Sequence, residues 1–370
     1  MSDPIPLLET PLAPLHRELG ARMVPFAGYL MPVQYPAGII AEHAHTRSKA
    51  SLFDVSHMGQ GRLSGDDVPH ALETLVPGDI MGLAPGAIRY TLLMNERGGI
   101  RDDLMVTNAG DHLFLVVNAA HRGDDFAHLR ASIGRRCLVE ELGEWGLLAL
   151  QGPAAAAVMA RLAPGSESMR FMTARSLTVA GIPCFVTRSG YTGEDGFELS
   201  VAATEALALA RALLAEPEVR PAGLGARDSL RLEAGLCLHG ADIDDATTPV
   251  EADLTWVIGR RRREHGGFPG ADVVQRQLAA GVERRRIGLI LHDRVPARAH
   301  AVITAADGRP IGTVTSGGFS PTLGQPIAMG YVETAQAVPG TAVRVMVRDV
   351  GREAVVTAMP FVPHRYHKGS

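Results

Sequence analysis

The sequence predicts an α+β protein that ends in a β-barrel or a β-sandwich. Up to about residue 280, strand-like apolar runs alternate with helix-like segments whose apolar residues recur every three to four positions. After Gly281 the pattern is almost purely β, with short Val/Ile-rich runs between turn residues. The chain has 370 residues, more than one hydrophobic core usually organises, so we expect two or three packed units.

Helices and strands are mixed in the first part of the chain. The expected helices include His121–Ile133, Ala154–Leu162, Ala203–Leu214 and Ala271–Ala280. The expected strands include Leu113–Val117, Leu147–Leu150 and Cys184–Thr187. Glu216–Gly225, with two prolines and two glycines, and Gly259–Gly270 are expected to be loops, the second near a domain boundary.

The C-terminal part, about 85 residues long, has the strand pattern of a barrel or sandwich. Its six expected strands are Ile287–Leu291, Ala301–Thr304, Thr313–Thr315, Ala328–Val332, Val343–Val347 and Ala354–Thr357. In Val343–Val347 every second residue is valine, which is the period of a half-buried strand. Asp307-Gly308 lies between two of these runs and predicts a hairpin turn.

Composition excludes several classes of protein. The formal charge is −4, from 36 basic and 40 acidic residues, so we expect neither a nucleic acid nor a membrane as partner. The longest weakly polar stretch, Leu147–Ala163, is interrupted by polar residues and a proline, which argues against a transmembrane helix. Met1–Pro14 has neither a signal-peptide nor a transit-peptide pattern. Three cysteines far apart predict no disulfide framework, and we expect a reduced, cytoplasmic location.

The segment Gly190–Glu198 (GYTGEDGFE) is the clearest candidate for a binding site. Its three glycines let the backbone turn tightly and approach a ligand, and Tyr191 supplies a flat face with a polar tip. The residues after it alternate as in a strand, with Glu198 and Ser200 on the face opposite Phe197. A carboxylate there can accept two N–H bonds from a heterocycle such as a pterin. The alternative is an acidic hairpin tip, and the residues alone leave both open.

Asp102 and Asp103 are a second candidate, because they directly precede the expected strand Leu104–Val106. Adjacent residues of a strand point to opposite faces, so only one of the two acids can enter a given cavity. A carboxylate beside an apolar strand can have a raised pKa and accept a proton. Alternatively, the pair ends a Gly-rich turn in solvent.

Arg227 is a third candidate. Leu230 follows it by three residues, which predicts a helical turn that starts near Asp228 or Ser229. Arg227 would then lie at the mouth of the helix, where its guanidinium could contact a ligand. The alternative is an ordinary surface arginine.

Histidines and arginine runs carry weaker signals. The segment Glu42–His57 contains three histidines, but it matches no recognised metal-ligand spacing, so we expect hydrogen-bonding histidines and no metal. Arg260–Arg263 and Arg284–Arg286 are either solvated faces or a docking surface for an acidic partner protein.

Eight segments, in order, resemble the aminomethyltransferases of the glycine cleavage system, the T-protein family. The segments are Ser51–Met58, Gly98–Val106, Leu150–Pro153, Gly190–Glu198, Ala226–Gly235, Thr248–Glu251, Thr315–Gly330 and Pro360–Pro363. The resemblance runs nearly end to end, and eight motifs in the right order are very specific.

The resemblance implies a three-domain cloverleaf with a C-terminal β-barrel and a central folate cavity. The expected division is two intertwined α+β domains, roughly 1–50 plus 140–280 and 51–139, followed by the barrel at 281–370. Tetrahydrofolate is the implied co-substrate, with no metal. The implied partner is the lipoylated H-protein, whose dihydrolipoyl arm carries the aminomethyl group, together with a functional association with the other glycine cleavage proteins. The products would be 5,10-methylenetetrahydrofolate, ammonia and the reduced lipoyl arm.

Site residues also follow from the resemblance. The catalytic acid falls on Asp103, which would accept the proton of the folate amine at position 10 or stabilise charge there, while Asp102 faces away. Glu198 would read the pterin ring. The other expected cavity residues are Met58, Phe114, Val116, Tyr191, Arg227, Trp256, Arg286 and Tyr366.

Two positions depart from the family pattern. Phe114 stands where other members often have tyrosine, so a phenolic hydrogen bond is lost while the aromatic surface remains. The tail His364–Ser370 also differs, which bears on Tyr366.

Related folate proteins are the main alternatives. Sarcosine and dimethylglycine oxidoreductases carry a flavin domain, and this chain has no dinucleotide fingerprint. The folate-binding proteins of iron–sulfur assembly carry a Gly-Cys-Tyr motif, and no cysteine here is followed by tyrosine. A folate carrier without catalysis is the third alternative.

Overall fold

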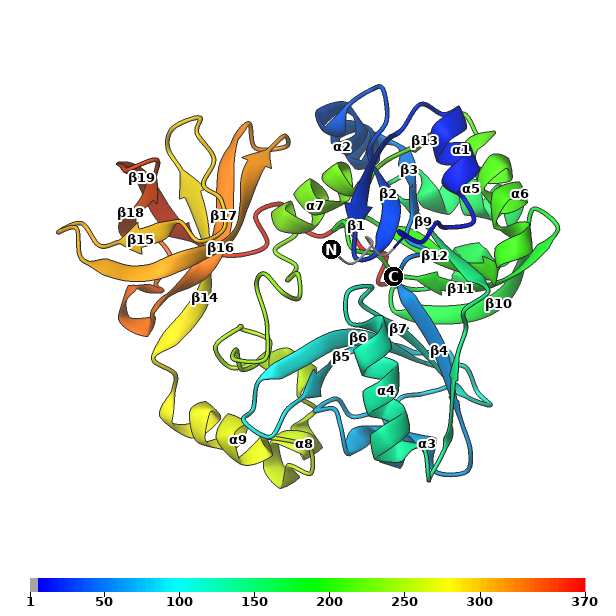
Figure 1. Cartoon of the computed structure of the whole chain (residues 1–370), viewed down its shortest axis with the longest axis horizontal. Helices are drawn as coiled ribbons and strands as arrows, with labels where there is room; N and C mark the ends of the chain where they lie inside the picture. Colours follow the sequence, from blue (N-terminus) through cyan, green and yellow to red (C-terminus); the bar gives the residue numbers. More distant parts are fainter. Residues whose placement is uncertain (1–5, 370) are drawn as a thin grey trace.

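The computed structural model describes residues 6–369, which form three lobes around a common centre (Figure 1). One lobe is built on a six-stranded sheet, the second on a five-stranded sheet, and the third is a closed barrel. The mixed α+β class and the C-terminal barrel expected from the sequence are both confirmed. No helix among the described residues has the length and apolar character needed to cross a membrane.

The first lobe is a mixed sheet with the strand order β10-β11-β12-β9-β3-β13. Its strands are β3 (Ala50–Asp54), β9 (Trp145–Gln151), β10 (Thr173–Val179), β11 (Ile182–Arg188), β12 (Gly196–Ala202) and β13 (Val219–Pro221). Its helices are α1 (Ala13–Glu18), α2 (Ile39–Ser48), α5 (Ala155–Leu162), α6 (Ala203–Leu214) and α7 (Leu224–Glu233), and β1 (Arg22–Phe26) and β2 (Tyr29–Gln34) form a separate hairpin. One face of the sheet packs on α5 and α6, where Phe197 and Leu199 enter the core with Val158 and Leu209.

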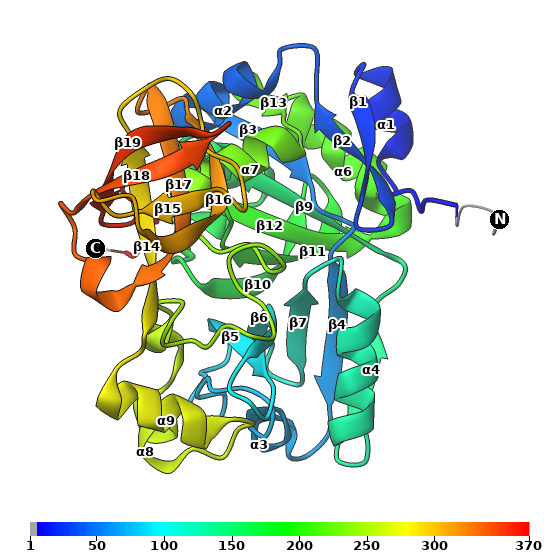
Figure 2. The same cartoon turned by 60° about the vertical axis from the view of Figure 1, so that its left-hand side comes forward.

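The second lobe is an antiparallel sheet with the order β5-β6-β7-β4-β8. Its strands are β4 (Gly59–Ser64), β5 (Ile88–Met94), β6 (Ile100–Asn108), β7 (Leu113–Val117) and β8 (Leu138–Glu141), and its helices are α3 (Val68–Glu73) and α4 (Arg122–Ile133). In both views α4 lies along β4 and β7 (Figures 1 and 2). A Cβ atom at Gly61 would lie 2.4 Å from the ring of Phe126, so only glycine lets this helix approach the strand so closely.

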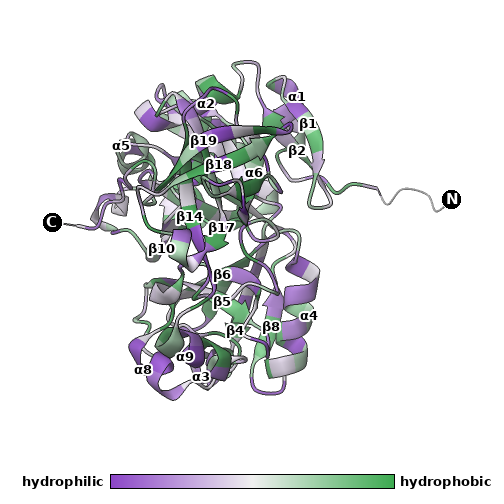
Figure 3. Cartoon of the chain, turned by 90° about the vertical axis from the view of Figure 1, so that its left-hand side faces the viewer, coloured by the Kyte–Doolittle hydropathy of each residue, from purple (hydrophilic) through white to green (hydrophobic). Residues whose placement is uncertain are grey.

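The surface of α4 shows the expected division between polar and apolar sides. Phe126, Leu129 and Ile133 are buried in the core of this lobe. Figure 3 shows hydrophilic and hydrophobic stretches alternating along α4, and a largely hydrophilic helix α8 (Arg260–His265). An apolar stripe of this kind is what holds a helix on a sheet.

The third lobe is a six-stranded barrel closed in the order β14-β17-β16-β15-β18-β19. Its strands are β14 (Arg284–Leu291), β15 (Val302–Thr304), β16 (Pro310–Ser320), β17 (Gln325–Glu333), β18 (Ala342–Val347) and β19 (Val350–Thr357). Strand β14 pairs with β17 on one side and with β19 on the other, which removes the free sheet edges. All six strands were expected from the sequence, and Asp307-Gly308 lies in the β15–β16 turn as predicted.

Two segments expected to be loops form regular structure. Glu216–Gly225 contains β13 and the start of α7, because Val219–Pro221 pairs in parallel with β3 and so has partners for its backbone. Gly259–Gly270 contains α8, which has no apolar periodicity to reveal it. The helix is held by Arg262, which donates hydrogen bonds to the backbone oxygens of Glu73 and Val76. Such contacts leave no hydrophobic pattern in the sequence.

The division into residues 1–50 plus 140–280, 51–139 and 281–370 stays a prediction. Two observations bear on its boundaries. Strand β3 belongs to the six-stranded sheet, through pairs with β9 and β13. Residues from Ile243 to Val274, including part of α9 (Ala271–Ala280), share a core with Leu92 and Ile100 of the five-stranded sheet.

A buried ion network connects the first lobe to the barrel. Glu233, at the end of α7, is 0% exposed and accepts hydrogen bonds from two residues of α2, His43 (3.1 Å) and Arg47 (2.8 Å). Across the lobe boundary, Ser320 Oγ (2.5 Å) and Thr322 N (3.0 Å) donate to the other carboxylate oxygen. Burial would raise the pKa of Glu233, but the bonds from His43, Ser320 and Thr322 outweigh it and hold the pKa at about 2.

We expect Glu233→Gln to lower the free energy of unfolding by about 3–5 kcal/mol, because it removes the buried charge that Arg47 and His43 share and leaves Glu194 as the acid partner of Arg47. Denaturant unfolding of both proteins at pH 7 measures this loss. The matched control is Glu333→Gln, which removes an exposed carboxylate paired with Arg309 and should leave the free energy of unfolding almost unchanged. Equal losses in the two variants would contradict the role given to Glu233.

Candidate functional site

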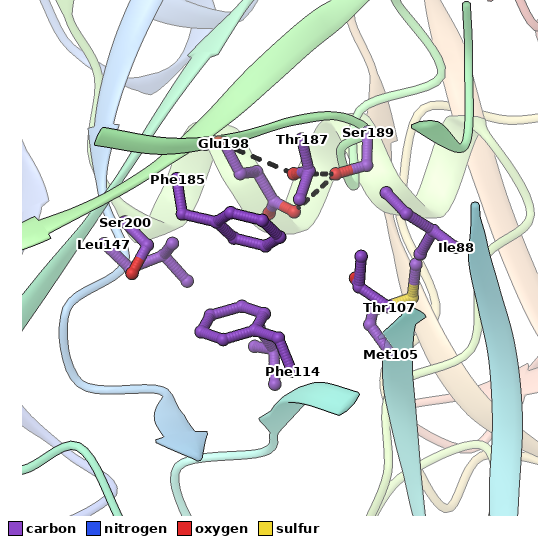
Figure 4. A pocket seen from close by; sticks show the side chains of 11 residues that line it. Ile88, Met105, Thr107, Phe114, Leu147, Phe185, Thr187, Ser189, Glu198 and Ser200 are labelled. Carbon is purple, nitrogen blue, oxygen red and sulfur yellow. Dashed lines mark hydrogen bonds between the residues drawn. The ribbon is translucent and has the colours of Figure 1, made fainter. Parts of the chain in front are cut away.

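The five-stranded and six-stranded sheets face each other across a small hollow (Figure 4). Its lining comes from both sheets: Ile88, Met105, Thr107, Phe114 and Val116 from one, and Leu147, Phe185, Thr187, Glu198 and Ser200, with Ser189 just beyond β11, from the other. The hollow has a volume of about 10 Å³, enough for little more than one water molecule. A larger ligand therefore has to displace side chains to enter it.

Phe114 and Phe185 separate this hollow from a wider one beside it. Their rings meet edge to face, with centroids 4.9 Å apart. A wider hollow of about 470 Å³, which Arg62 and Trp145 help to line, shares this aromatic pair as a wall. The aromatic surface expected of Phe114 is thus present, and it closes the inner hollow.

Asp103 and Asp102 lie on opposite faces of β6, as the sequence predicts. Asp103 shares its face with Met105 and Thr107, which line the hollow, whereas Asp102 is 0% exposed on the core side. Asn118 Nδ2 donates to Asp103 Oδ1 at 2.8 Å, and Tyr90 also hydrogen-bonds this carboxyl. Burial and the nearby charge of Asp102 raise the pKa of Asp103 to about 6.

Glu198 extends from β12 towards the same hollow, on the face opposite Phe197. Ser189 Oγ donates to Glu198 Oε2 at 2.8 Å (Figure 4). The charge of Glu198 also acts on Arg227: burial lowers the pKa of the Arg227 guanidinium, and Glu198 opposes that shift. A carboxylate with a single side-chain donor keeps capacity for a ligand's N–H groups.

Arg227 lies within α7 and not at its mouth, which corrects the expected start near Asp228 or Ser229. The helix begins at Leu224, about one turn before the expected start. Gly223 N donates a hydrogen bond to the buried carboxylate of Glu42, which fixes the backbone at this point. The Arg227 guanidinium lies 4.6 Å from the centroid of the Tyr191 ring. The Tyr191 hydroxyl in turn donates to the backbone oxygen of Cys237.

Met58 and Val116 pack on one apolar cluster with Ala226 and Leu230 of α7. Met58 therefore lies beside the hollow, which Val116 lines directly. The structure thus brings together Asp103, Glu198, Phe114, Val116, Met58, Tyr191 and Arg227 around one centre.

Trp256 and Arg286 lie further out. Trp256, in the short helix η2 (Thr255–Val257), is 63% exposed and stacks on Tyr90 at 5.6 Å. Arg286 is 8% exposed, and its guanidinium donates to the backbone oxygens of Ala252 and Gly235. It is thus tied to the protein and is not a free cation.

Tyr366 belongs to the C-terminal tail and does not line the hollow. Its ring stacks on Phe171 with centroids 3.9 Å apart, and it adjoins the charges of Arg47 and Glu194. The tail is held by a bond from Arg365 N to Gly193 O, so Tyr366 approaches the Gly190–Glu198 segment from its outer side. Its role in a ligand site stays a prediction.

Two acids of Gly190–Glu198 are engaged in ion pairs. Glu194, with a side chain 0% exposed, binds Arg47 at 2.9 Å. Asp195 accepts two bonds from the guanidinium of Arg188, at 3.0 and 2.5 Å. From the sequence, this segment could be a ligand-binding loop or an acidic hairpin tip. In the structure Glu194 and Asp195 have a structural role, whereas Glu198 points to the hollow.

The histidines of Glu42–His57 hold the protein together. His43 bonds Ser229 and Glu233, and His45 bonds the backbone oxygen of Glu218. His57 is 2% exposed, and burial lowers its pKa to about 4. Within residues 6–369 no cluster of three or more His, Cys, Asp or Glu could hold a metal.

The arginine runs do not form a free basic patch. Arg261 pairs with Glu73 and Asp79, and Arg284 pairs with Glu251. The other arginines with partners within the protein are Arg260, Arg262, Arg263, Arg285 and Arg286. The idea of a docking surface on these runs therefore gains no support from the structure.

Sequence reasoning missed Tyr90, Asn118, Asp125 and His239. Asn118 directly follows an expected strand, and a polar residue at that point was a usable signal. Tyr90 and His239 come from segments distant in sequence, and only their packing against β6 brings them near the acids. Asp125 lies on an expected helix, where an acid is unremarkable until its burial is known.

Comparisons with known proteins agree with this architecture. Residues 12–262 match the model of the GCVT N-terminal domain, and residues 284–363 match that of the glycine cleavage T-protein C-terminal barrel domain. The chain belongs to the glycine cleavage T-protein family.

Full-length relatives of this T-protein are similar throughout. The mitochondrial aminomethyltransferase of Gallus gallus is 52% identical, covering 99% of this chain and 95% of the relative. That of Dictyostelium discoideum is 46% identical, covering 98% and 94%. The crystal structure of glycine cleavage system aminomethyltransferase T from Bartonella henselae superimposes with a TM-score of 0.93 at 45% identity, covering 98% of this chain and 100% of that one.

The different duties of Glu194 and Glu198 predict different effects on stability. We expect Glu194→Gln to destabilise the protein by about 3–5 kcal/mol, because the buried Arg47 loses a charged partner. Glu198→Gln should cost about 1 kcal/mol or less, because an amide oxygen still accepts the Ser189 hydroxyl. Thermal melting of the two variants distinguishes them, and a larger loss for Glu198→Gln would reverse the assignment.

Proposed function

We propose that this T-protein transfers the methylene carbon of an aminomethyl group, carried on the dihydrolipoyl arm of H-protein, to tetrahydrofolate. The single observation that carries the proposal is the position of Asp103. Its carboxyl lies on the hollow-lining face of β6 with a raised pKa, across from Glu198 on the facing sheet. Family membership supplies the class of reaction, and this pair of acids supplies a place for it.

Recognition of the folate is assigned to the six-stranded sheet. Among the described residues, Ser189 is the side chain that donates a hydrogen bond to Glu198, so the carboxylate has acceptor capacity left. Glu198 would use it to accept two parallel N–H bonds from the edge of the pterin. Arg227, held over Tyr191, would contact the same ligand from α7. To fill the inner hollow, the pterin would have to separate the rings of Phe114 and Phe185, which are in contact. The two rings would then pack against the bound pterin.

The chemistry is assigned to Asp103. The folate amine at position 5 attacks the methylene carbon, the bond from that carbon to the departing nitrogen breaks, and ammonia leaves. The amine at position 10 then closes the ring, the carbon–sulfur bond breaks and the lipoyl sulfur leaves as a thiol. The protons lost by the two folate nitrogens end on ammonia and on the thiol. Asp103 would take the proton of the position-10 amine, since a base with a pKa near neutrality accepts and returns protons readily.

Placing both substrates in one enclosed site would supply much of the rate, because oriented groups react with large effective molarities. Exclusion of water would also limit hydrolytic loss of the methylene carbon as formaldehyde. The hydrophobic side chains around the hollow, Met105, Val116 and Leu147, suit both purposes.

Partners and location are part of the proposal. H-protein follows from the reaction, and we assign it no docking surface. The cytoplasmic location stays a prediction, since the names of the relatives place those proteins in mitochondria.

We expect Asp103→Asn to reduce kcat by a factor of about 10²–10⁴ while tetrahydrofolate affinity changes little, because the amide keeps the hydrogen bonds but cannot accept a proton. The assay combines aminomethylated H-protein with tetrahydrofolate and measures methylenetetrahydrofolate and ammonia. Wild-type protein without activity in this assay would reject the proposed reaction. Near-normal turnover in Asp103→Asn would remove Asp103 from the chemistry.

Glu198→Gln should weaken tetrahydrofolate binding by a factor of about 10–100, since one of the two charge-assisted hydrogen bonds becomes a clash of N–H donors. Equilibrium titration of folate measures this change. Glu194→Gln, studied at a temperature where it is folded, is the matched control and should bind folate normally. Similar losses in both variants would place the effect in the loop and not in the Glu198 carboxylate.

A further inference from the structure

The wider hollow beside Phe114 and Phe185 has no part in the proposed reaction. Its volume of about 470 Å³ lies in the range of small-molecule sites in proteins. Ser176 and Thr178, which line it, are exposed, whereas Phe114 and Ser200 in its wall are buried. The hollow therefore extends from solvent to the buried region between the two sheets, and a small molecule can enter it.

Arg62, on β4, supplies a positive charge to this hollow. Its guanidinium carbon lies 5.5 Å from the centroid of the Trp145 ring, which also lines the hollow. The Nε atom of Arg62 is buried, and within residues 6–369 no hydrogen bond or ion pair engages the guanidinium. Buried polar groups nearly always have a partner. This guanidinium therefore lacks an acceptor that a ligand in the hollow could supply.

Two acids near Arg62 leave it unpaired. Glu140 lies directly opposite Arg62 where β8 pairs with β4, but its side chain is exposed, and in the described part of the chain no ion pair joins the two. Asp111, which also lines the hollow, is exposed and bonds His112 Nδ1 at 2.7 Å. The charge of Arg62 thus stays available in a partly enclosed space, where it attracts an anion more strongly than in bulk water.

The other walls of the hollow suit a flat apolar group. The rings of Phe114 and Phe185 lie between the two sheets (Figure 4), and Leu177 and Pro183 add apolar surface. An arginine can bind a planar carboxylate through two parallel N–H donors. Among the described residues no lysine and no second arginine lines the hollow, so a singly charged carboxylate suits it better than a dianionic phosphate.

The two hollows share one wall. Phe114, Phe185 and Ser200 line both of them. A pterin in the inner hollow would push the two aromatic rings apart, and the wider hollow is the space beside them that can receive a displaced ring. A molecule bound in the wider hollow would hold the rings in place and so oppose the entry of the pterin.

We propose that the wider hollow binds a small aromatic carboxylate, with the carboxylate on Arg62 and the ring against Trp145 and the aromatic wall, and that the bound molecule weakens the binding of tetrahydrofolate. The binding site itself does not depend on the proposed function. The effect on folate rests on that function. Because linkage is reciprocal, folate must weaken the binding of the carboxylate by the same factor.

A ligand-observed NMR titration of the full-length protein with benzoate tests the site. We expect saturable binding with a Kd of about 1 mM or below, which is within reach of a ligand of this size. Benzamide keeps the shape without the charge, and acetate keeps the charge without the ring, so each should bind about ten times more weakly or worse. Absence of saturable benzoate binding, or equal binding of all three compounds, would overturn the proposal.

Three variants locate the bound molecule. Arg62→Gln should weaken benzoate binding by a factor of about 10 or more and leave benzamide binding unchanged. Glu140→Gln is the matched control, because it removes the exposed acid opposite Arg62 and should leave benzoate binding as tight as before or slightly tighter. Thr178→Trp adds a bulky ring at the exposed end of the hollow and should block benzoate, which keeps the test open if Arg62→Gln does not fold. Unchanged benzoate binding in Arg62→Gln or in Thr178→Trp would overturn the assignment.

Titration of tetrahydrofolate at increasing benzoate concentrations measures the effect on folate. We expect the apparent Kd of tetrahydrofolate to rise by a factor of about 5 or more and then to level off once the wider hollow is full. A rise without a limit would show competition for one site and overturn the separate site, and no rise would overturn the effect on folate. Protein that binds benzoate through Arg62 but does not bind tetrahydrofolate would reject the proposed function and leave the benzoate site intact.

Discussion

A buried carboxylate joins the barrel to the first lobe. Glu233 ends α7, and its two oxygens are shared between α2 of the first lobe and the end of β16 in the barrel. Beside it, Leu232 packs on two buried barrel residues, Ile327 and Met329, and the partly buried Ile290, Met359 and Phe361 extend this apolar cluster. A buried ion pair costs desolvation, and what it contributes is a defined geometry. Because α7 also carries Arg227 and packs on the cluster beside the hollow, the same contact fixes one wall of the candidate site.

The site uses the two faces of its strands for different purposes. Strand β12 sends Phe197 and Leu199 into a core and Glu198 towards the hollow, and β6 sends Leu104 and Val106 into another core and Asp103 towards the hollow. Each acid is therefore rigidly placed by the packing of its neighbours. Recognition and proton transfer are assigned to different sheets, so the distance between them depends on how the two lobes meet.

Much of the fold was predictable because its signals are local. The six barrel strands follow from alternation and turn residues, and Ala203–Leu214 and Ala271–Ala280 have the predicted bounds. Helix α8 was missed because arginine contacts to backbone oxygens, and not an apolar stripe, hold it in place. Of the expected site residues, Phe114, Val116 and Glu198 line the hollow, whereas Arg286 and Tyr366 do not. The position of Tyr366 depends on how the tail packs on Phe171, which no local pattern encodes.

The buried partners of Asp103 show why a reactive acid cannot be understood from its own strand. Alternation in β6 decides which of two adjacent acids faces the hollow, and that much is visible in the sequence. The proton affinity of the acid depends on its neighbours, because burial and the charge of Asp102 raise the pKa of Asp103, whereas His239, Tyr90 and Asn118 lower it. Asp102, on the far face of the strand, thus contributes to the electrostatics of the hollow without lining it. The balance of these influences holds the pKa of Asp103 at about 6, where a base can both take a proton and release it.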